Sequence, residues 1–271
     1  MSQRDMAELF GKQAQRYVDG RPSYPPQLFQ FIASKTPSHD LAWDVGTGSG
    51  QAARSLAEIY KNVVATDVSP KQLELAPKLP NVRYELTSPV VSTAELQQKV
   101  SADSTVDLVT IAMALHWFDR PNFYRQAKRL LKKPHGVIAA CGYTMPRVTG
   151  PVDSIYEKFY SMDSNPYWSP THKLVIDEYR DMDFPFEPVE GMEDTGPVRF
   201  VAERAMGLDE FLTFIRSTSP YLKAREEGVE LLGRDVVERY ERAWNEDGEE
   251  EKTVKFPVFL RIGKVGNSSM D

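Results

Sequence analysis

Three glycines at alternate positions constrain this chain more than any other stretch of its sequence. Gly46, Gly48 and Gly50 lie in the segment Trp43–Gln51, which follows a short apolar approach and precedes a run of helix-forming residues at 52–57. This order predicts a strand, a tight turn and the start of a helix. Because glycine has no Cβ, the backbone of such a turn can come into contact with a ligand. A strand-to-helix turn also offers backbone N–H groups to a nucleotide-like cofactor.

An acidic residue follows the glycine turn at a suitable spacing. The β-branched run Val63–Asp67 ends in Asp67, and in a βαβ nucleotide site an acid roughly twenty residues after the turn binds both hydroxyls of a ribose. The alternative role for Asp67 is to cap a helix that begins around 69–72. The turn and the acid together, in this order, favour the nucleotide-type site.

Strands and helices alternate strictly between residues 40 and 143. Apolar or β-branched runs at 81–86, 106–112 and 137–143 predict three further strands, and Phe123–Leu131 has the spacing of an amphipathic helix. We therefore expect an α/β fold with a Rossmann-like, doubly wound parallel sheet.

The second half of the chain differs in texture from the first. Prolines and aromatic residues cluster beyond Pro146, and helices are expected at 208–216 and 228–244. The segment 198–201 could pair with a neighbouring strand, and 254–262 is expected to return as a strand. A partly helical C-terminal cover and a returning C-terminal strand should therefore complete the fold. The expected division is an N-terminal helical lid and Pro-rich connector (1–36), a cofactor-binding core (37–145), a substrate-covering region with the closing strand (146–265) and a tail (266–271).

Composition narrows the possible partners. The formal net charge of -6 argues against general nucleic-acid binding, which needs a basic face. No apolar run approaches the roughly 20 residues of a membrane span, and the N-terminus lacks the apolar core of a secretory signal. The lone Cys141 excludes an intramolecular disulfide and suits a reducing compartment. His39, His135 and His172 stand in loop-like contexts and suggest no metal site. A cytoplasmic protein with no nucleic-acid or membrane partner is the default expectation, and the oligomeric state is left open.

Several motifs together carry a family resemblance. They are the glycine turn preceded by Asp44, the acid Asp67, the run Ala-Leu-His-Trp-Phe-Asp at 114–119, and an upstream element between Tyr17 and Pro25. In these motifs the chain resembles class I S-adenosylmethionine-dependent methyltransferases, in the small-molecule branch that includes trans-aconitate methyltransferase-like proteins. The likeness to plant members of this group extends over nearly the whole chain, including 184–191 and 255–264.

The resemblance implies S-adenosyl-L-methionine as the cofactor and S-adenosyl-L-homocysteine as the product. Gly46 and Gly48 would take the aminoacyl part and Asp67 the ribose hydroxyls, with Asp44 an anchor for the ammonium, indirectly or through water. Ser88 is expected near the adenine edge, although the usual acidic marker is displaced or absent there. Trp117 could pack on the adenosine or wall the transfer site, or simply anchor the following helix. The expected cofactor-binding residues are Tyr17, Asp44, Gly46, Gly48, Asp67, Ser88, Ala112, Met113 and Trp117.

The acceptor is a small molecule whose class the sequence does not decide. Methyl transfer from a sulfonium requires the protein to bind, align and desolvate the nucleophile. A carboxylate is ionised at neutral pH and needs only a cationic or hydroxyl-rich pocket, whereas an amine or phenol makes a base such as His116 useful. O-methylation of a carboxylic acid is the preferred chemistry, and His116 is the catalytic candidate, with a hydrogen-bonded loop histidine as the alternative. The expected substrate-binding residues are Arg21, Tyr24, His116, Trp168 and Arg216.

Two other functions stay open. A dinucleotide or nucleotide-sugar enzyme could use the same fold, but its fingerprint G-x-G-x-x-G has a third glycine where this chain has Gln51. A non-catalytic protein could keep the cofactor site and have lost turnover, because a fold alone does not fix function.

Overall fold

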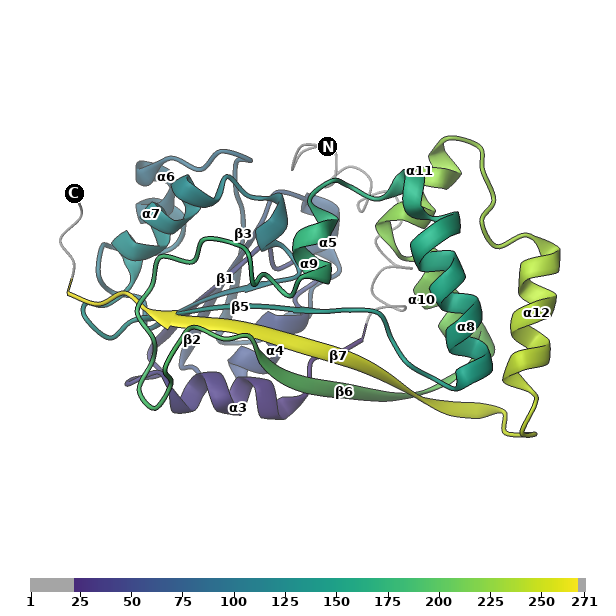
Figure 1. The fold of residues 1–271 in the computed structure, drawn as a ribbon. Helices are drawn as coiled ribbons and strands as arrows, with labels where there is room; N and C mark the ends of the chain where they lie inside the picture. Colours follow the sequence, from purple (N-terminus) through teal and green to yellow (C-terminus); the bar gives the residue numbers. More distant parts are fainter. Residues whose placement is uncertain (1–21, 268–271) are drawn as a thin grey trace.

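A seven-stranded sheet forms the centre of the protein, in the strand order β3-β2-β1-β4-β5-β7-β6 (Figure 1). The structure is a computed structural model that describes residues 22–267. Strands β1 to β5 are parallel to one another, and β7 runs antiparallel between β5 and β6. The strands are β1 (Leu41–Val45), β2 (Asn62–Asp67), β3 (Val82–Leu86), β4 (Leu108–Ala112), β5 (Val137–Tyr143), β6 (Val198–Gly207) and β7 (Glu251–Lys264). The predicted α/β, Rossmann-like doubly wound sheet with a returning strand is confirmed.

Helices cover both faces of the sheet. The helices α3 (Pro26–Ser34) and α4 (Gln51–Ala57) lie on one face, and α6 (Thr93–Lys99) and α7 (Arg120–Leu130) lie on the other (Figure 1). The alternation of β4 explains this arrangement, because Leu108 packs into the core beside α3 and α4, whereas Val109 and Ile111 pack beside α6 and α7. Strands buried on both faces are mostly apolar, as β4 and β5 are, and the polar exception in β4 is Thr110, whose hydroxyl has a hydrogen-bond partner.

A second group of helices gathers beyond the sheet, at the end where β7 begins (Figure 1). Aromatic side chains join its members. Phe211 contacts Tyr156 with ring centroids 5.7 Å apart and Trp244 with centroids 5.6 Å apart, and all three side chains are buried. The group consists of α8 (Gly150–Lys158), the π-helix η2 (Phe159–Asp163), α10 (Leu208–Arg216), α11 (Ser219–Glu226) and α12 (Arg234–Trp244). Shorter elements complete the described chain: α5 (Pro70–Glu74), α9 (His172–Ile176) and the 3-10 helices η1 (Leu115–Trp117) and η3 (Asn165–Tyr167).

The helix predicted over 228–244 starts too early, because the observed helix α12 begins at Arg234. Gly228 has a φ of +79° and lies just after the end of α11, so it belongs to the end of that helix and not to the start of α12. Positive φ at a glycine is the usual way to end a helix. Helix α11 was not predicted, although Pro220 occupies its first turn, where proline is favoured.

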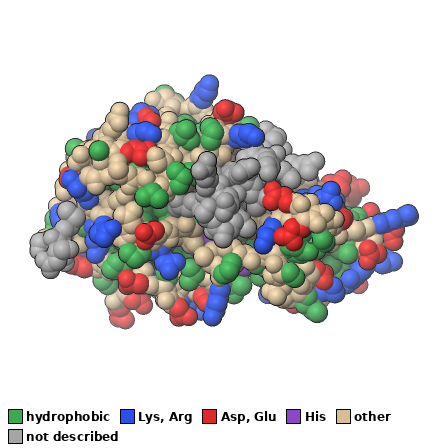
Figure 2. All heavy atoms as spheres, turned by 90° about the horizontal axis from the view of Figure 1, so that it is seen from above, with side chains coloured by type: hydrophobic (Ala, Val, Ile, Leu, Met, Phe, Trp, Pro, Cys, Tyr) green, Lys and Arg blue, Asp and Glu red, His purple; other side chains and the backbone are tan. Residues whose placement is uncertain are grey.

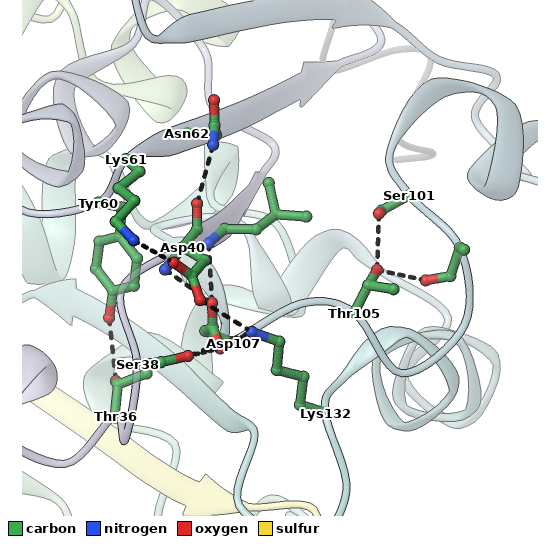
Figure 3. Close-up of polar contacts among 12 residues, drawn as sticks. Thr36, Ser38, Asp40, Tyr60, Lys61, Asn62, Ser101, Thr105, Asp107 and Lys132 are labelled. Carbon is green, nitrogen blue, oxygen red and sulfur yellow. Dashed lines mark hydrogen bonds and ion pairs between the residues drawn. The ribbon is translucent and has the colours of Figure 1, made fainter.

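A buried carboxylate ties the amino ends of β1 and β4 together (Figure 3). Asp107 is 3% exposed, and its Oδ2 accepts hydrogen bonds from the backbone N–H groups of Asp40 and Leu41, both at 2.9 Å. Its Oδ1 accepts a hydrogen bond from Ser38 and lies 2.6 Å from Nζ of Lys132. This network lies at the amino ends of the strands, whereas the glycine turn lies at their carboxyl ends, so we interpret the network as structural.

The surface seen in Figure 2 carries lysine, arginine and acidic side chains interspersed with one another. Between residues 22 and 267, no helix has both the length and the apolar character required to cross a membrane. The expectation that the chain has no nucleic-acid partner stays a prediction.

Candidate active site

The glycine turn follows β1 and leads into α4, as its spacing predicts. Gly46, Gly48 and Gly50 have φ values of +62°, +57° and +82°, a region that side chains with a Cβ rarely adopt. At Gly46 a Cβ would also lie 2.8 Å from the Cβ of Ala114. The turn is therefore a backbone cradle whose shape depends on glycine.

Asp67 ends β2 and connects directly to the turn. Its Oδ2 accepts a hydrogen bond from the N–H of Gly48 at 2.8 Å, and its Oδ1 accepts one from the N–H of Ser69 at 2.8 Å. Burial raises the pKa of this carboxyl group. Asp67 does not cap the following helix α5. Its cap is Ser69, whose hydroxyl accepts a hydrogen bond from the N–H of Gln72.

Asp44 lies near the carboxyl end of the inner strand β1 and is 0% exposed. The hydroxyl groups of Thr47 and Thr110 donate hydrogen bonds to its two oxygens, at 2.6 and 2.8 Å. Burial raises the pKa of Asp44 to about 6, against the effect of these two donors. A carboxylate has about four lone-pair sites, so these two hydroxyl groups and the backbone N–H of Ala53 leave room for one further, cationic partner.

Three neighbouring cavities open around the carboxyl ends of the strands. The turn cavity is lined by Tyr24, Asp44, Gly46 and Gly48, among others, and the strand-end cavity by Gly46, Asp67, Ser88 and Trp117. The aromatic cavity is lined by His116, Trp117, Tyr143, Thr144, Met145, Pro146, Tyr156, Tyr160, Trp168, Ser169, His172, Phe214, Thr218 and Ser219.

Met113 contributes to the lining of all three cavities. It has a φ of +52°, which is unusual for a residue with a side chain. Its N–H donates to the carbonyl of Cys141 at 2.8 Å, and its Sδ accepts from the N–H of Tyr143 at 3.3 Å. Trp117 lines both the strand-end cavity and the aromatic cavity. These two side chains therefore form the wall between a region beside Asp67 and a region beside the histidines.

Two histidines face the aromatic cavity. His116 is 4% exposed, its Nδ1 lies 2.8 Å from the hydroxyl oxygen of Tyr179, and burial lowers its pKa to about 3. His172 stacks on Trp168 with ring centroids 3.5 Å apart, and its Nε2 lies 2.7 Å from the hydroxyl oxygen of Tyr160. Burial lowers the pKa of His172 to about 4. Both imidazoles are consequently neutral at pH 7.

The structure brings most of the sequence-predicted residues to these cavities. Tyr24, expected at the substrate, lines the turn cavity beside Asp44, whereas His116 and Trp168 line the aromatic cavity. Arg216 does not appear among the described residues that line any of the three, and its guanidinium acts on the hydroxyl of Tyr221, where it opposes the burial that raises the pKa of that group. Tyr17 and Arg21 lie outside the described residues. The residues that line the turn or strand-end cavities as expected of cofactor contacts are Asp44, Gly46, Gly48, Asp67, Ser88, Ala112, Met113 and Trp117.

The sequence did not single out His172 or Tyr179 as site residues, whereas Tyr160 lies in the aromatic region Tyr156–Trp168 that was expected to cover the acceptor. His172 was interpreted as a loop histidine, and its contact with Tyr160 forms only because the π-helix and the turns after it bring the two side chains together. The cluster of aromatic residues between 156 and 168 was the available signal. Across 22–267, no group of three or more His, Cys, Asp or Glu side chains is arranged to hold a metal ion.

The glycine turn and Asp67 together fit a nucleotide-like cofactor. A Cβ-free cradle at Gly46 and Gly48, an acid at the end of β2 and a cavity between them are present together. Because the cradle lies at the carboxyl ends of parallel strands, where open α/β sheets bind ligands, the residues fit an adenosine carrying an amino-acid tail.

Known proteins support the same conclusion. Residues 43–140 match the family described as "Methyltransferase domain". A Dictyostelium discoideum protein named as a methyltransferase is 31% identical, with 95% of each chain covered. The methyltransferase cfoB of Aspergillus candidus is 29% identical over 62% of this chain and 59% of its own length. A solved structure from Anaeromyxobacter dehalogenans, described as a type II methyltransferase, is 30% identical with a TM-score of 0.76, covering 90% of this chain and 98% of that one. The chain belongs to the S-adenosylmethionine-dependent methyltransferase family, whose cofactor is S-adenosyl-L-methionine.

Proposed function

We propose that this protein transfers the methyl group of S-adenosyl-L-methionine to an uncharged small molecule bound in the aromatic cavity. The observation that carries the proposal is the shared wall: Met113 and Trp117 line the cavity beside Asp67 and also the cavity beside His116. A donor on one side of this wall and an acceptor on the other would meet at it.

The cofactor would be held by backbone and carboxylate groups. Asp67 would accept hydrogen bonds from the ribose hydroxyls, because each of its oxygens has one protein donor and keeps a further lone pair. Asp44 would face the ammonium across the turn cavity, and Gly46 and Gly48 would admit the aminoacyl part. When bound, the cofactor supplies a methyl group on a positively charged sulfur and its own leaving group.

The charge of the aromatic cavity favours a neutral acceptor over a carboxylate. Its described lining contains two neutral histidines and no Lys, Arg, Asp or Glu. A carboxylate would meet hydroxyl donors in this cavity, such as those of Ser169, Thr218 and Ser219, but no counter-charge from the described lining, so its desolvation would cost more than that of a neutral acceptor. Arg216 does not line the cavity, so methylation of a carboxylic acid, the chemistry preferred from the sequence, would have to rely on these hydroxyl groups. We therefore propose a planar acceptor with a phenolic hydroxyl, which stacks well on aromatic walls.

Methylating a hydroxyl releases a proton, and the cavity offers imidazoles to take it. His116 was the candidate from the sequence. The ring of His172 is fixed in the cavity by stacking on Trp168 and by its contact with the hydroxyl of Tyr160, whereas Nδ1 of His116 lies 2.8 Å from the hydroxyl of Tyr179. We propose that His172 accepts the proton and that His116 orients the acceptor. The site would keep its net charge, because the imidazole gains a positive charge as the sulfur loses one.

The test has two independent parts. Calorimetry with S-adenosyl-L-homocysteine should show binding that Asp67→Ala weakens strongly, and an absence of binding would refute the cofactor site. A methyl-donor assay should then compare acceptors that share one aromatic ring and carry a hydroxyl, an amine or a carboxylate. Phenol methylation that falls at least tenfold in His172→Gln supports the proposal, with Trp168→Phe as the control that keeps the stacking ring. Methyl esters formed without methylated phenols would refute the neutral acceptor while leaving the cofactor site intact.

A further inference from the structure

We propose that β6 pairs edge to edge with β6 of a second copy of this chain, antiparallel about a two-fold axis at Val201, and so forms a homodimer with one continuous sheet. The proposal rests on the outer edge of the sheet and is independent of the proposed function. Within the described chain, β6 is the last strand of the sheet (Figure 1), ten residues long, and pairs only with β7.

The backbone groups of every second residue in β6 point to the free edge. In a strand, the N–H and C=O of one residue point to the same side. The carbonyl of Pro257 accepts from the N–H of Thr144, and Lys255 exchanges two hydrogen bonds of 2.8 Å with Arg147, so both residues direct their polar groups away from β6. Their partners in β6 are Val201 and Glu203. Neither can form ladder hydrogen bonds with β7, and their N–H and C=O groups therefore face outward.

The same alternation of outward-facing backbone groups continues along β6. Arg199 lies opposite Phe259, two residues from Pro257, and Ala205 lies opposite Thr253, so both also present their backbone groups to the edge. The side chains of Arg199, Val201, Glu203 and Ala205 are all exposed, with Val201 51% exposed. Unpaired strand edges of this kind are templates for pairing with another chain.

The order of charges selects one register. Antiparallel pairing about Val201 places Arg199 of each copy opposite Glu203 of the other, with Val201 opposite Val201. Moving the axis to Glu203 or to Arg199 places like charges opposite each other, which is destabilising. The intermediate registers place each charge opposite an apolar side chain or a strand end. Only the Val201 register satisfies the edge hydrogen bonds and both charge pairs at once.

Contacts within the chain are compatible with this pairing. Nη2 of Arg199 lies 2.9 Å from a carboxylate oxygen of Glu178, and Nζ of Lys255 lies 3.6 Å from Glu203. A guanidinium has five donors, so Arg199 can bind Glu178 and a second carboxylate together. Each interface charge would then belong to a network of opposite signs. The dimer is isologous, the commonest symmetry of soluble homo-oligomers.

Sedimentation velocity over a concentration series tests the proposal. The wild-type chain is expected to form dimers. Arg199→Glu and Glu203→Arg should each weaken dimerisation by about tenfold or more, because the two-fold axis turns one substitution into two like-charge contacts. The double variant Arg199→Glu with Glu203→Arg should recover dimerisation, since it exchanges the charges across the same register.

The matched control is Arg204→Glu. Arg204 lies on the same strand, but its side chain is on the opposite face of the sheet from those of Arg199, Val201 and Glu203, and it pairs with Glu210. Arg204→Glu therefore makes the same charge change away from the interface residues and should still dimerise. Thermal melting of every variant separates loss of pairing from loss of folding, and Val201→Arg supplies a second variant that places like charges on the axis. A wild-type chain that stays monomeric, or a dimer indifferent to both single reversals, would overturn the proposal.

Discussion

Asp67 and Gly48 are joined by a hydrogen bond of 2.8 Å between the carboxylate Oδ2 and the backbone N–H. This bond connects the end of β2 to the turn that follows β1, two strands that lie side by side with Val45 opposite Thr66. The acid that the family resemblance assigns to the ribose is thus held in place by the turn assigned to the aminoacyl part. The residues expected at the ribose and those expected at the aminoacyl part are therefore held together by a direct hydrogen bond.

Removing this carboxylate should weaken cofactor binding by at least about a hundredfold. Asp67→Ala deletes the acceptor for two ribose hydroxyls, and hydrogen bonds to a charged group contribute about 1.5–3 kcal/mol each. It also leaves the N–H of Gly48 without its partner. Calorimetry with S-adenosyl-L-homocysteine measures the change, and Asp67→Asn, which keeps the shape of the side chain, should lose less. Equal affinity in the wild type and Asp67→Ala would remove Asp67 from the site.

The glycines of the turn should differ in how much they tolerate alanine. Both Gly46 and Gly48 have positive φ, which costs a residue with a Cβ about 1–2 kcal/mol. Gly46→Ala adds a contact of 2.8 Å with Ala114, whereas at Gly48 the nearest atom is Oε1 of Gln72 at 3.8 Å. Gly46→Ala should therefore lower the melting temperature and cofactor affinity more than Gly48→Ala. A larger loss at Gly48 would contradict this ranking.

Asp44 should make the fold less stable as the pH rises. Its carboxyl pKa is raised from 3.8 to about 6 in the folded state, so between these values the folded chain binds more protons than the unfolded chain. The favourable contribution is complete below pH 3.8 and is lost as the pH rises through about 6, by roughly 3 kcal/mol in all. Urea denaturation at several pH values should show the stability of the wild type falling relative to Asp44→Asn across this window. A constant difference between the two proteins would show that Asp44 does not titrate there.

The first half of the site was more predictable from the sequence than the second. The turn at Gly46–Gly50 and the acid at Asp67 are short motifs whose geometry follows from strand order and positive φ. The aromatic cavity instead combines segments as distant as Met113 and Ser219, and no local pattern encodes their packing. Arg216 illustrates the limit. It ends α10 only two residues before Thr218, yet Thr218 lines the cavity and Arg216 does not.

The pH dependence of methyl transfer tests the two neutral histidines. Burial lowers the pKa of His116 to about 3 and that of His172 to about 4, so acidification from pH 8 to pH 5 should protonate neither in the free enzyme. The value of kcat/KM for a phenolic acceptor should therefore show no loss attributable to histidine over this range. A rate that falls with a midpoint near pH 6.5 in the wild type, but not in His172→Gln, would indicate an exposed, ordinary histidine.

The network around Asp107 should contribute strongly to stability without touching function. Asp107→Ala leaves the N–H groups of Asp40 and Leu41 without their acceptor and removes one of the two carboxylates beside the ammonium of Lys132. Unsatisfied buried donors cost about 1–3 kcal/mol each, so a loss of about 3 kcal/mol is expected in urea denaturation. Asp40→Ala is the matched control, because its carboxylate is 49% exposed and pairs with Lys61 and Lys132 at the surface, where ion pairs contribute at most about 1 kcal/mol. Cofactor affinity should be unchanged in both folded variants, since the network lies at the amino ends of the strands and Gly46 and Asp67 lie at the carboxyl ends. If Asp107→Ala lost cofactor affinity at a temperature where it remains folded, the amino and carboxyl ends of the strands would be coupled through β1 and β4.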